Sequence, residues 1–266
     1  MRMQGKVVLV TGAALGYKEG GLSIGGSIAR RLAAEGARVI VVDINDQMGE
    51  RSAQRIRDAG GESLYVHADV SKTDEVVAAI ARTRDEYGAL HCLVNCAASY
   101  PIEMWRNVVE TDEKVWQHVI DVNVSGYFRF AKYGIPLILE SGGGTIVNMS
   151  SGSANLVAKN WCTYPVTKAA ILALTRTLAV DFAPQIRANA ICPGFVAIAN
   201  SELDRTREEV EAWHGRIAAR YPMRRVCTTE EIANVALFLA CEDSSFVNGE
   251  CLVVDGGRAV WEVPPA

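Results

Sequence analysis

Tyr164 and Lys168 are the residues whose types and spacing in this 266-residue sequence suggest chemistry most directly. Apolar residues recur at helical intervals from Cys162 to Phe182, so this segment is predicted to be a long, largely buried helix. Residues four apart share a helix face, which brings the phenol near the ammonium. A neighbouring positive charge favours phenolate and is expected to lower the pKa of Tyr164 from about 10. Tyr164 is therefore a candidate acid–base group, although an isolated pair of this kind is more often structural.

Short apolar runs alternate with helical patterns along the whole chain. The first run, Lys6–Gly12, is rich in β-branched residues and ends in glycine, which is typical of a buried parallel strand. Further strands are expected at Ala37–Asp43, Ser63–His67, Leu90–Asn95, Thr145–Met149, Arg187–Cys192 and Glu250–Gly257. Helices are expected at Ser27–Gly36, Gln47–Ala59, Thr73–Tyr87, Asp112–Leu139, Cys162–Phe182, Ser201–Arg220 and Thr229–Ala240. This alternation predicts an α/β fold, a Rossmann-like, doubly wound parallel sheet of seven strands in a single domain, residues 1–266.

The carboxyl ends of the predicted strands should meet at one edge of the sheet. Ligands of doubly wound sheets bind at that edge, where the order of the strands reverses. The residues that come just after predicted strands, and are therefore expected there, are Gly12, Asp43, Asp69, Asn95, Ser150, Ser151 and Pro193.

A glycine-rich loop, Thr11–Gly25, lies between the first predicted strand and its helix. Such a loop exposes backbone N–H groups at a helix N-terminus, where a pyrophosphate is favoured. The glycine spacing is irregular, and an ordinary flexible loop explains it equally well.

Two aspartates offer hydrogen bonds to an adenosine. Asp43 ends the second predicted strand, where a carboxylate accepts both ribose hydroxyls and repels a 2′-phosphate, which favours NAD over NADP. Lys18 would soften that repulsion. Asp69 follows the third predicted strand and would bond the adenine amino group, or else cap the next helix, a role that Ser71 also fits.

Composition argues against several kinds of partner. The formal net charge of −4 gives no electrostatic reason to expect nucleic acid or an anionic membrane surface. No apolar run approaches the ~18–20 residues that span a bilayer, and the chain runs into its first strand without a leader, so a cytoplasmic location is expected. The seven cysteines are scattered and are expected to be reduced, mostly buried thiols. Cys92 and Cys96 lie beside His91, but no second Cys/His pair stands at ligand spacing, so no metal site is predicted.

Together these features resemble the short-chain dehydrogenases/reductases, the family with a YxxxK active site. The resemblance covers nearly the whole chain and depends on the order and spacing of the motifs more than on any one of them. The motifs are TGAA at Thr11, the acidic strand end at Asp43, ADV at Asp69–Val70, LVNCAA at Asn95, VNVSGYF at Asn123, IVNMSS at Ser151, YPVTK at Tyr164, ICPGFV at Pro193–Gly194 and LVVDGG near the end.

The resemblance implies a role for each matching residue. Ser151, 13 residues before Tyr164, would hydrogen-bond the substrate oxygen, Tyr164 would move the proton, and Lys168 would hold the nicotinamide ribose. Asn123 would anchor a water that links Lys168 to solvent, unless it only kinks a helix, and Ser150 is the alternative to Ser151. The implied catalytic residues are Asn123, Ser151, Tyr164 and Lys168, and the implied cofactor-binding residues are Gly12, Ser23, Ile24, Asp43, Asp69, Val70, Asn95, Ala97, Tyr164, Lys168, Pro193 and Val196.

The glycine loop departs from the family pattern. It is longer than the usual TGxxxGxG, and Ser23 stands in place of the middle glycine. Its LSIG end is similar to that of bacterial enoyl reductases, which separate Tyr and Lys by a longer gap than the one found here. The extra segment, Leu15–Leu22, would either fold over the pyrophosphate or form a solvated bulge, which Gly20 and Gly21 favour.

Two further departures lie near the expected nicotinamide. Cys96 and Ala98 replace an Asn and a Gly of the family's NNAG, which would change the loop but leaves its backbone contacts possible. Ile198 stands where a threonine often binds the carboxamide, so backbone groups near Val196 would orient the nicotinamide.

The predicted activity is the NAD-dependent interconversion of a secondary alcohol and a ketone or aldehyde-type carbonyl, with Tyr164 as acid and base. The expected substrate pocket is formed by the segments Ala98–Trp105, Ser153–Trp161 and Phe195–Arg220 and is rich in aromatic residues. This composition favours a small substrate with a cyclic or aromatic group. Alternatives are a 3-oxoacyl thioester reductase, a sugar or polyol dehydrogenase and, more distantly, a non-catalytic nucleotide-binding sensor. Related enzymes are usually homotetramers built on two long helices, so a homotetramer is expected.

Overall fold

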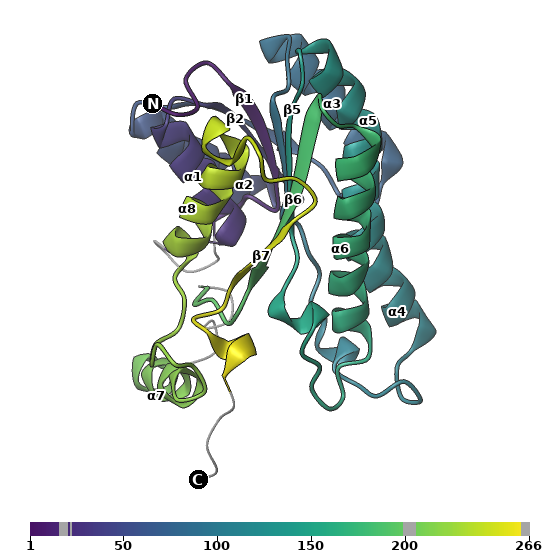
Figure 1. Ribbon diagram of the computed structural model, residues 1–266, viewed down its shortest axis with the longest axis vertical. Helices are drawn as coiled ribbons and strands as arrows, with labels where there is room; N and C mark the ends of the chain where they lie inside the picture. The colour runs from purple at the N-terminus through teal and green to yellow at the C-terminus, as the bar shows by residue number, and fades with distance from the viewer. Residues whose placement is uncertain (16–20, 22, 199–205, 262–266) are drawn as a thin grey trace.

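One sheet of seven parallel strands forms the centre of the computed structural model (Figure 1). The structure describes residues 1–15, 21, 23–198 and 206–261. The strand order is β3–β2–β1–β4–β5–β6–β7, so the winding reverses between β1 and β4. The strands are β1 (Val7–Thr11), β2 (Arg38–Asp43), β3 (Glu62–His67), β4 (Cys92–Asn95), β5 (Gly144–Met149), β6 (Ile186–Pro193) and β7 (Cys251–Val254). The predicted single-domain, doubly wound α/β fold is confirmed.

Helices cover both faces of the sheet (Figure 1). The helices are α1 (Ile24–Ala34), α2 (Asp46–Asp58), α3 (Thr73–Tyr87), α4 (Glu113–Ile120), α5 (Gly126–Glu140), α6 (Thr163–Asp181), α7 (Arg207–Ala218) and α8 (Thr229–Ala240). α1, α2 and α8 lie on one face, and α3, α5 and α6 lie on the other. Because both faces are covered, a strand such as β1 is buried along its whole length, which explains its unbroken apolar sequence.

Two apolar clusters, one on each face, hold the helices to the sheet. On the first face Ile28 of α1 and Ile232 of α8 lie in the same buried cluster as the strand residue Val10. On the second face Phe130 of α5 and Leu178 of α6 lie in a cluster beneath the other side of the strands. The strands and helices are thereby fixed as one body, with the loops that follow the strands at the carboxyl edge of the sheet.

The helical stretch predicted from Asp112 to Leu139 is divided in the structure. α4 ends at Ile120, a π-helical turn runs from Asp121 to Ser125, and α5 continues from Gly126. Such a turn often occurs at functional sites, because it points a side chain away from the regular helical path. The predicted helix Ser201–Arg220 is observed as α7, and residues 201–205 lie outside the described part of the chain.

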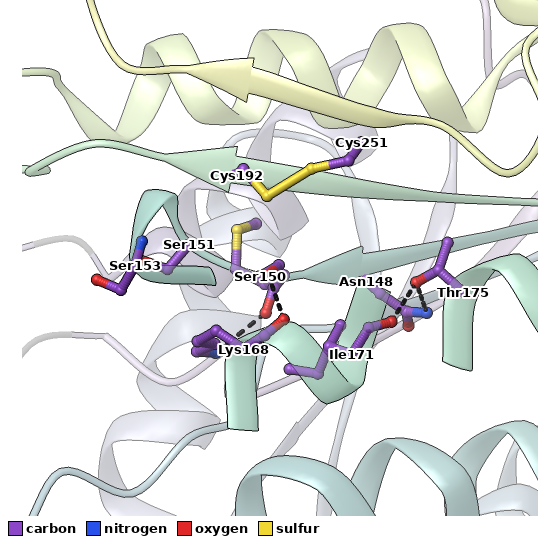
Figure 2. The surroundings of a disulfide bond; sticks show 10 residues. Asn148, Ser150, Ser151, Ser153, Lys168, Ile171, Thr175, Cys192 and Cys251 are labelled. Atoms are coloured by element: carbon purple, nitrogen blue, oxygen red, sulfur yellow. Dashed lines mark hydrogen bonds between the residues drawn. A yellow bond between two sulfur atoms is a disulfide. The ribbon is translucent and has the colours of Figure 1, made fainter. Parts of the chain in front are cut away.

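The expectation that all seven cysteines are reduced is wrong for one pair. Cys192 of β6 and Cys251 of β7 form a disulfide (Figure 2). β6 and β7 are adjacent, and Cys251 pairs in register with Ala190, two residues before Cys192, so both side chains share one face of the sheet. Their Cα atoms are 6.4 Å apart, within reach of a disulfide. The sequence did not predict the pair because it depends on which strands are neighbours.

Within the described residues, the helices are too short or too polar to cross a membrane.

Candidate active site

Three of the predicted catalytic side chains lie together at the carboxyl edge of the sheet. Ser151 comes two residues after β5, Tyr164 lies in the first turn of α6, and Lys168 lies one turn further along that helix. Pro165 costs α6 no hydrogen bond, because N–H groups in a first turn have no partner within the helix. The helix can therefore begin at the site and present Tyr164 at its mouth.

The hydroxyl groups of Ser151 and Tyr100 act on the Tyr164 hydroxyl, and each lowers its pKa. Ser151 Oγ accepts the backbone N–H of Ser153 at 3.1 Å, which leaves the hydroxyl hydrogen of Ser151 for donation onward. Burial raises the pKa of Tyr164 above its usual value, and the two hydroxyl partners oppose part of that rise.

The Lys168 side chain is buried, with 1% of its surface exposed. Its Nζ donates to the main-chain carbonyl of Met149 at 3.0 Å, and the Tyr127 hydroxyl donates to the same oxygen at 3.1 Å. Burial lowers the pKa of Lys168 to about 8, because desolvation disfavours the ammonium. An ammonium has three N–H donors, so this position leaves Lys168 able to bind other acceptors.

The prediction that Lys168 lowers the pKa of Tyr164 below its usual value is wrong, because the pKa of Tyr164 is raised. The Lys168 Nζ lies 5.6 Å from the centre of the Tyr164 ring and is bonded to Met149. Burial penalises the phenolate and also weakens the positive charge that would stabilise it. The spacing predicted the neighbourhood of the two groups but not the depth at which they lie.

Ser150 and Ser151 occupy different environments. Ser150 is buried, and its hydroxyl donates to the Lys168 carbonyl at 2.8 Å, which ties β5 to α6 (Figure 2). Ser151 is partly exposed, and its hydroxyl acts on the Tyr164 hydroxyl to lower its pKa. Of the two serines, Ser151 is the one that the structure brings to Tyr164.

Asn123 is completely buried within the π-helical turn. Its Oδ1 accepts the backbone N–H of Ser99 at 2.7 Å, and its Nδ2 donates to the Ser99 carbonyl at 3.1 Å. The side chain thus fixes the loop after β4. Asn123 thus lies at a helix irregularity, as one of the two predictions expected. Its role as the anchor of a water stays a prediction.

A buried chain of hydrogen-bonded polar side chains connects the strands and the helix that carry the site. Asn95 Nδ2 donates to Asn148 Oδ1 at 2.9 Å, and Asn148 Nδ2 donates to Thr175 Oγ1 at 2.9 Å. Thr175 in turn donates to the Ile171 carbonyl at 2.8 Å (Figure 2). This chain links β4, β5 and α6, and it places the predicted cofactor residue Asn95 in a supporting position.

The glycine loop packs tightly where it leaves β1. Gly12 has a φ of +64°, and a Cβ there would lie 2.6 Å from the Cα of Ala97. A Cβ on Gly25 would lie 2.3 Å from the Gly12 carbonyl oxygen. Ser23 caps α1, since its Oγ accepts the Gly26 N–H at 2.9 Å. The side chain of Ser23 therefore serves the helix, and Ile24 begins the turn whose N–H groups have no partner within the helix.

The two predicted adenosine residues are both held by main-chain N–H groups. Asp43 Oδ2 accepts from Ala14 at 3.0 Å, and Oδ1 accepts from Asn45 at 3.0 Å. Asp69 Oδ1 accepts from Ser71 at 2.8 Å. These bonds orient the carboxylates and leave lone pairs for hydroxyl or amino groups.

The remaining predicted cofactor residues lie on the same edge. The N–H of Ala97 donates to Thr11 Oγ1 at 3.2 Å, which holds the loop after β4 against β1. Val70 is buried against the N-terminus of α5. Pro193 ends β6, and Val196 forms an isolated bridge with Cys227, so that the segment after β6 is held in place.

Comparisons with known proteins agree with this geometry. A family model described as enoyl-(acyl carrier protein) reductase matches residues 20–259. An uncharacterized oxidoreductase of Thermotoga maritima is 37% identical over 97% of this chain and 98% of its own length. The 2-(S)-hydroxypropyl-CoM dehydrogenase 3 of Xanthobacter autotrophicus is 34% identical, over 96% of this chain and 97% of that protein. The solved structure of the Thermoplasma acidophilum aldohexose dehydrogenase is 32% identical, with a TM-score of 0.86 over 99% of this chain and 98% of that one.

The chain belongs to the short-chain dehydrogenase/reductase family. It is an oxidoreductase of that family, and the resemblance noted in the sequence is confirmed.

The residues present fit the nicotinamide dinucleotide that the family's dehydrogenases use. The close packing of Gly12 and Gly25 leaves no room for a side chain at either position, so that a ligand can approach the backbone closely there. A helix N-terminus suits a pyrophosphate, and the oriented carboxylate of Asp43 suits ribose hydroxyls. Lys168 supplies N–H donors at the other end of the edge. The segment Leu15–Leu22, with Lys18, lies mostly outside the described residues, so its two interpretations stay predictions.

Aromatic rings surround the mouth of this short-chain dehydrogenase/reductase site. The centres of the Tyr100, Trp105 and Trp161 rings lie 5.6, 5.7 and 6.3 Å from that of Tyr164. In the segment after β6, the Phe195 ring packs edge-on against the Trp213 ring of α7, with the ring centres 4.9 Å apart. Three of the rings that the sequence assigns to the expected pocket wall therefore pack around Tyr164, and the pocket itself stays a prediction.

The sequence did not identify three residues that shape the site. Asn148 and Thr175 complete the buried polar chain, and Tyr127 shares the Met149 carbonyl with Lys168. Asn148 lies within IVNMSS and Tyr127 within VNVSGYF, so both stand inside motifs already recognised. Their contacts depend on strand register and helix depth, which those motifs do not reveal.

Proposed function

We propose that this protein is an NAD-dependent oxidoreductase that interconverts a secondary alcohol and a ketone, with Tyr164 as the acid and base. The observation that carries the proposal is the Tyr164 hydroxyl with Ser151 as its partner and buried Lys168 one helical turn away. A buried phenol with a donor and an amine beside it suits proton transfer to and from a substrate oxygen. The same edge of the sheet holds Gly12 and Asp43, which suit a dinucleotide.

In the oxidation direction, the ionised oxygen of Tyr164 takes the proton of the substrate hydroxyl. Ser151 donates its hydroxyl hydrogen to the substrate oxygen and so stabilises charge that develops there. Lys168 holds ribose hydroxyls through the N–H donors that Met149 does not use, and Asn123 anchors a water that returns the proton to solvent. The chemistry supplied by bound NAD is the uptake of a hydride from the carbinol carbon.

Asp43 supports NAD rather than NADP. Its two oxygens are held by the N–H groups of Ala14 and Asn45, so the negative charge is fixed at the end of β2. A carboxylate at this position accepts ribose hydroxyls and repels a 2′-phosphate.

The substrate proposed is a small secondary alcohol with a cyclic or aromatic group. Support comes from the rings of Tyr100, Trp105 and Trp161 around Tyr164, since aromatic faces pack well against flat or ring-shaped molecules. A sugar is the second candidate, favoured by the similarity to an aldohexose dehydrogenase. The similarity to a dehydrogenase named for a 2-hydroxypropyl group agrees with secondary-alcohol chemistry.

The test is the absorbance of reduced nicotinamide when the protein is mixed with NAD or NADP and a panel of cyclic, aromatic, sugar and hydroxyacyl alcohols. The proposal expects signal with NAD, strongest for ring-bearing secondary alcohols. Signal with sugars alone would favour the second candidate, and signal with 3-hydroxyacyl thioesters alone would favour a thioester reductase. Binding of NAD with no turnover of any alcohol would indicate a nucleotide-binding sensor.

We also propose a cytoplasmic homotetramer. The outer faces of α5 and α6 expose apolar side chains, including Phe128 and Val180, whose exposed fractions are 51% and 78%. Sedimentation at micromolar concentration should give the mass of four chains. Thiols are kept reduced in the cytoplasm, so counting the free thiols of protein released anaerobically from cells tests the location: a reduced Cys192–Cys251 pair supports it, and an intact disulfide overturns it.

A further inference from the structure

Tyr100 places a second phenol beside Tyr164. The two rings are 5.6 Å apart at an interplanar angle of 56°, and the Tyr100 hydroxyl acts on the Tyr164 hydroxyl to lower its pKa. Tyr100 comes from the loop after β4, whereas Tyr164 comes from α6, so the phenols approach each other from different elements. About half of the Tyr100 side chain is exposed, which puts it at the mouth of the site.

The loop that carries Tyr100 is fixed by the residue just before it. Both backbone groups of Ser99 are bonded to the buried amide of Asn123, at 2.7 and 3.1 Å. The Ser99 hydroxyl also lies 3.0 Å from His118 Nε2. The main chain at Tyr100 is therefore held by α4 and the π-helical turn, and its ring is held against Tyr164.

We propose that Tyr100 is a positioning residue that donates a hydrogen bond to the ionised oxygen of Tyr164. The proposal deepens the proposed function, because it assigns the support of the proton-transfer group in that same site. An ionised Tyr164 has no hydrogen to donate, so any hydroxyl bonded to it must be the donor. Ser151 is the other donor, but during turnover it also serves the substrate oxygen. Tyr100 then maintains the charged state of Tyr164 while Ser151 is engaged.

Removing the Tyr100 hydroxyl should raise the proton affinity of Tyr164. A hydrogen bond to a charged group corresponds to roughly one pH unit of proton affinity. Alcohol oxidation needs Tyr164 ionised, so its rising limb against pH should move upward by about one unit in Tyr100→Phe. Carbonyl reduction needs Tyr164 protonated, so its falling limb should move upward as well. A shift of the same sign in both directions is not expected from a residue that only binds substrate.

The experiment compares Tyr100→Phe with Trp105→Phe. Trp105 packs its ring 5.7 Å from Tyr164, nearly the Tyr100 distance, but has no hydroxyl. Two measurements are made for each variant: the pH dependence of kcat/KM in both directions, and the ionisation of Tyr164 followed by ultraviolet difference absorbance. For the second, the same variant carrying Tyr164→Phe in addition is subtracted, so that the signal belongs to Tyr164. The oxidation assays and the titration use the intact protein saturated with NAD, and the reduction assays use it saturated with NADH.

The proposal expects the Tyr164 midpoint to rise by about one pH unit in Tyr100→Phe and to stay in place in Trp105→Phe. An unmoved midpoint in Tyr100→Phe overturns it, as does an equal rise in both variants, which would assign the effect to ring packing. The difference titration needs no turnover. A raised midpoint in a protein that oxidises no alcohol would therefore uphold the role of Tyr100 while rejecting the proposed function.

Discussion

The two ends of the carboxyl edge are built in different ways. At the ends of β1 to β3, backbone groups shape the edge. Gly12 packs against Ala97, and two backbone N–H groups orient the carboxylate of Asp43. At the ends of β4 to β6, side chains shape the edge. The buried Lys168 is hydrogen-bonded to the Met149 carbonyl, and Tyr164 is surrounded by hydroxyl groups and aromatic rings.

Under the proposed function, this difference separates cofactor binding from proton transfer. Main-chain donors and a fixed carboxylate recognise a ligand without changing their own charge. Buried phenol and amine groups have pKa values that depend on every neighbour, which suits a group that must gain and lose a proton. Substitutions at one end should therefore change affinity, and those at the other should change rate.

Tyr164→Phe is expected to have the largest effect. It removes the acid–base oxygen and keeps the ring, so kcat should fall by roughly 10²–10⁴-fold, the usual contribution of such a group. The affinity for NAD, measured by calorimetry, should stay within a few-fold of the wild type. Residual activity within tenfold of the wild type would remove Tyr164 from its proposed role.

The two neighbouring serines provide a matched pair. Ser151→Ala removes a donor to the substrate oxygen and should lower kcat by about 10²-fold. Ser150→Ala removes the hydrogen bond to the Lys168 carbonyl and should lower the free energy of unfolding by about 1 kcal/mol, with a much smaller effect on kcat. Equal losses of kcat in the two variants, measured beside urea denaturation, would contradict their separation.

The pH dependence should follow the ionisation of Tyr164. Burial raises its pKa, so the ionised form increases with pH, and kcat/KM for alcohol oxidation should rise by up to about tenfold per pH unit between pH 6 and pH 8. Carbonyl reduction uses the protonated form and should show no such rise. A flat oxidation profile, with a substrate whose chemistry limits the rate, would argue against a tyrosine base.

Asp43→Asn tests the binding end and should have a smaller effect. The amide keeps the size of the side chain but removes the charge, so NAD affinity should fall by about tenfold and the discrimination against NADP should weaken. Asp46→Asn is the control, because Asp46 lies three residues further on and bonds Tyr65 and His67 instead. Dissociation constants for both nucleotides, measured for both variants, would refute the assignment if Asp46→Asn had the larger effect.

The fold and the binding end could be predicted from sequence because their signals are local. Alternating apolar runs gave the strands, and the placement of Gly12 and Asp43 depends only on where β1 and β2 end. The position of Tyr164 near Lys168 followed from helical spacing. The raised pKa of Tyr164 did not, because it depends on how deeply the folded chain buries the phenol. The Cys192–Cys251 disulfide was missed for a similar reason, since it depends on the neighbourhood of β6 and β7.

The most direct test of the account follows the hydrogen of the carbinol carbon. Wild-type protein is incubated with NAD and secondary alcohols that carry deuterium at that carbon, and the reduced nicotinamide is weighed by mass spectrometry. The account predicts that deuterium moves to the cofactor in the wild type and that Tyr164→Phe slows the transfer by at least about 10²-fold. Reduced cofactor without deuterium, or undiminished transfer in Tyr164→Phe, would contradict it.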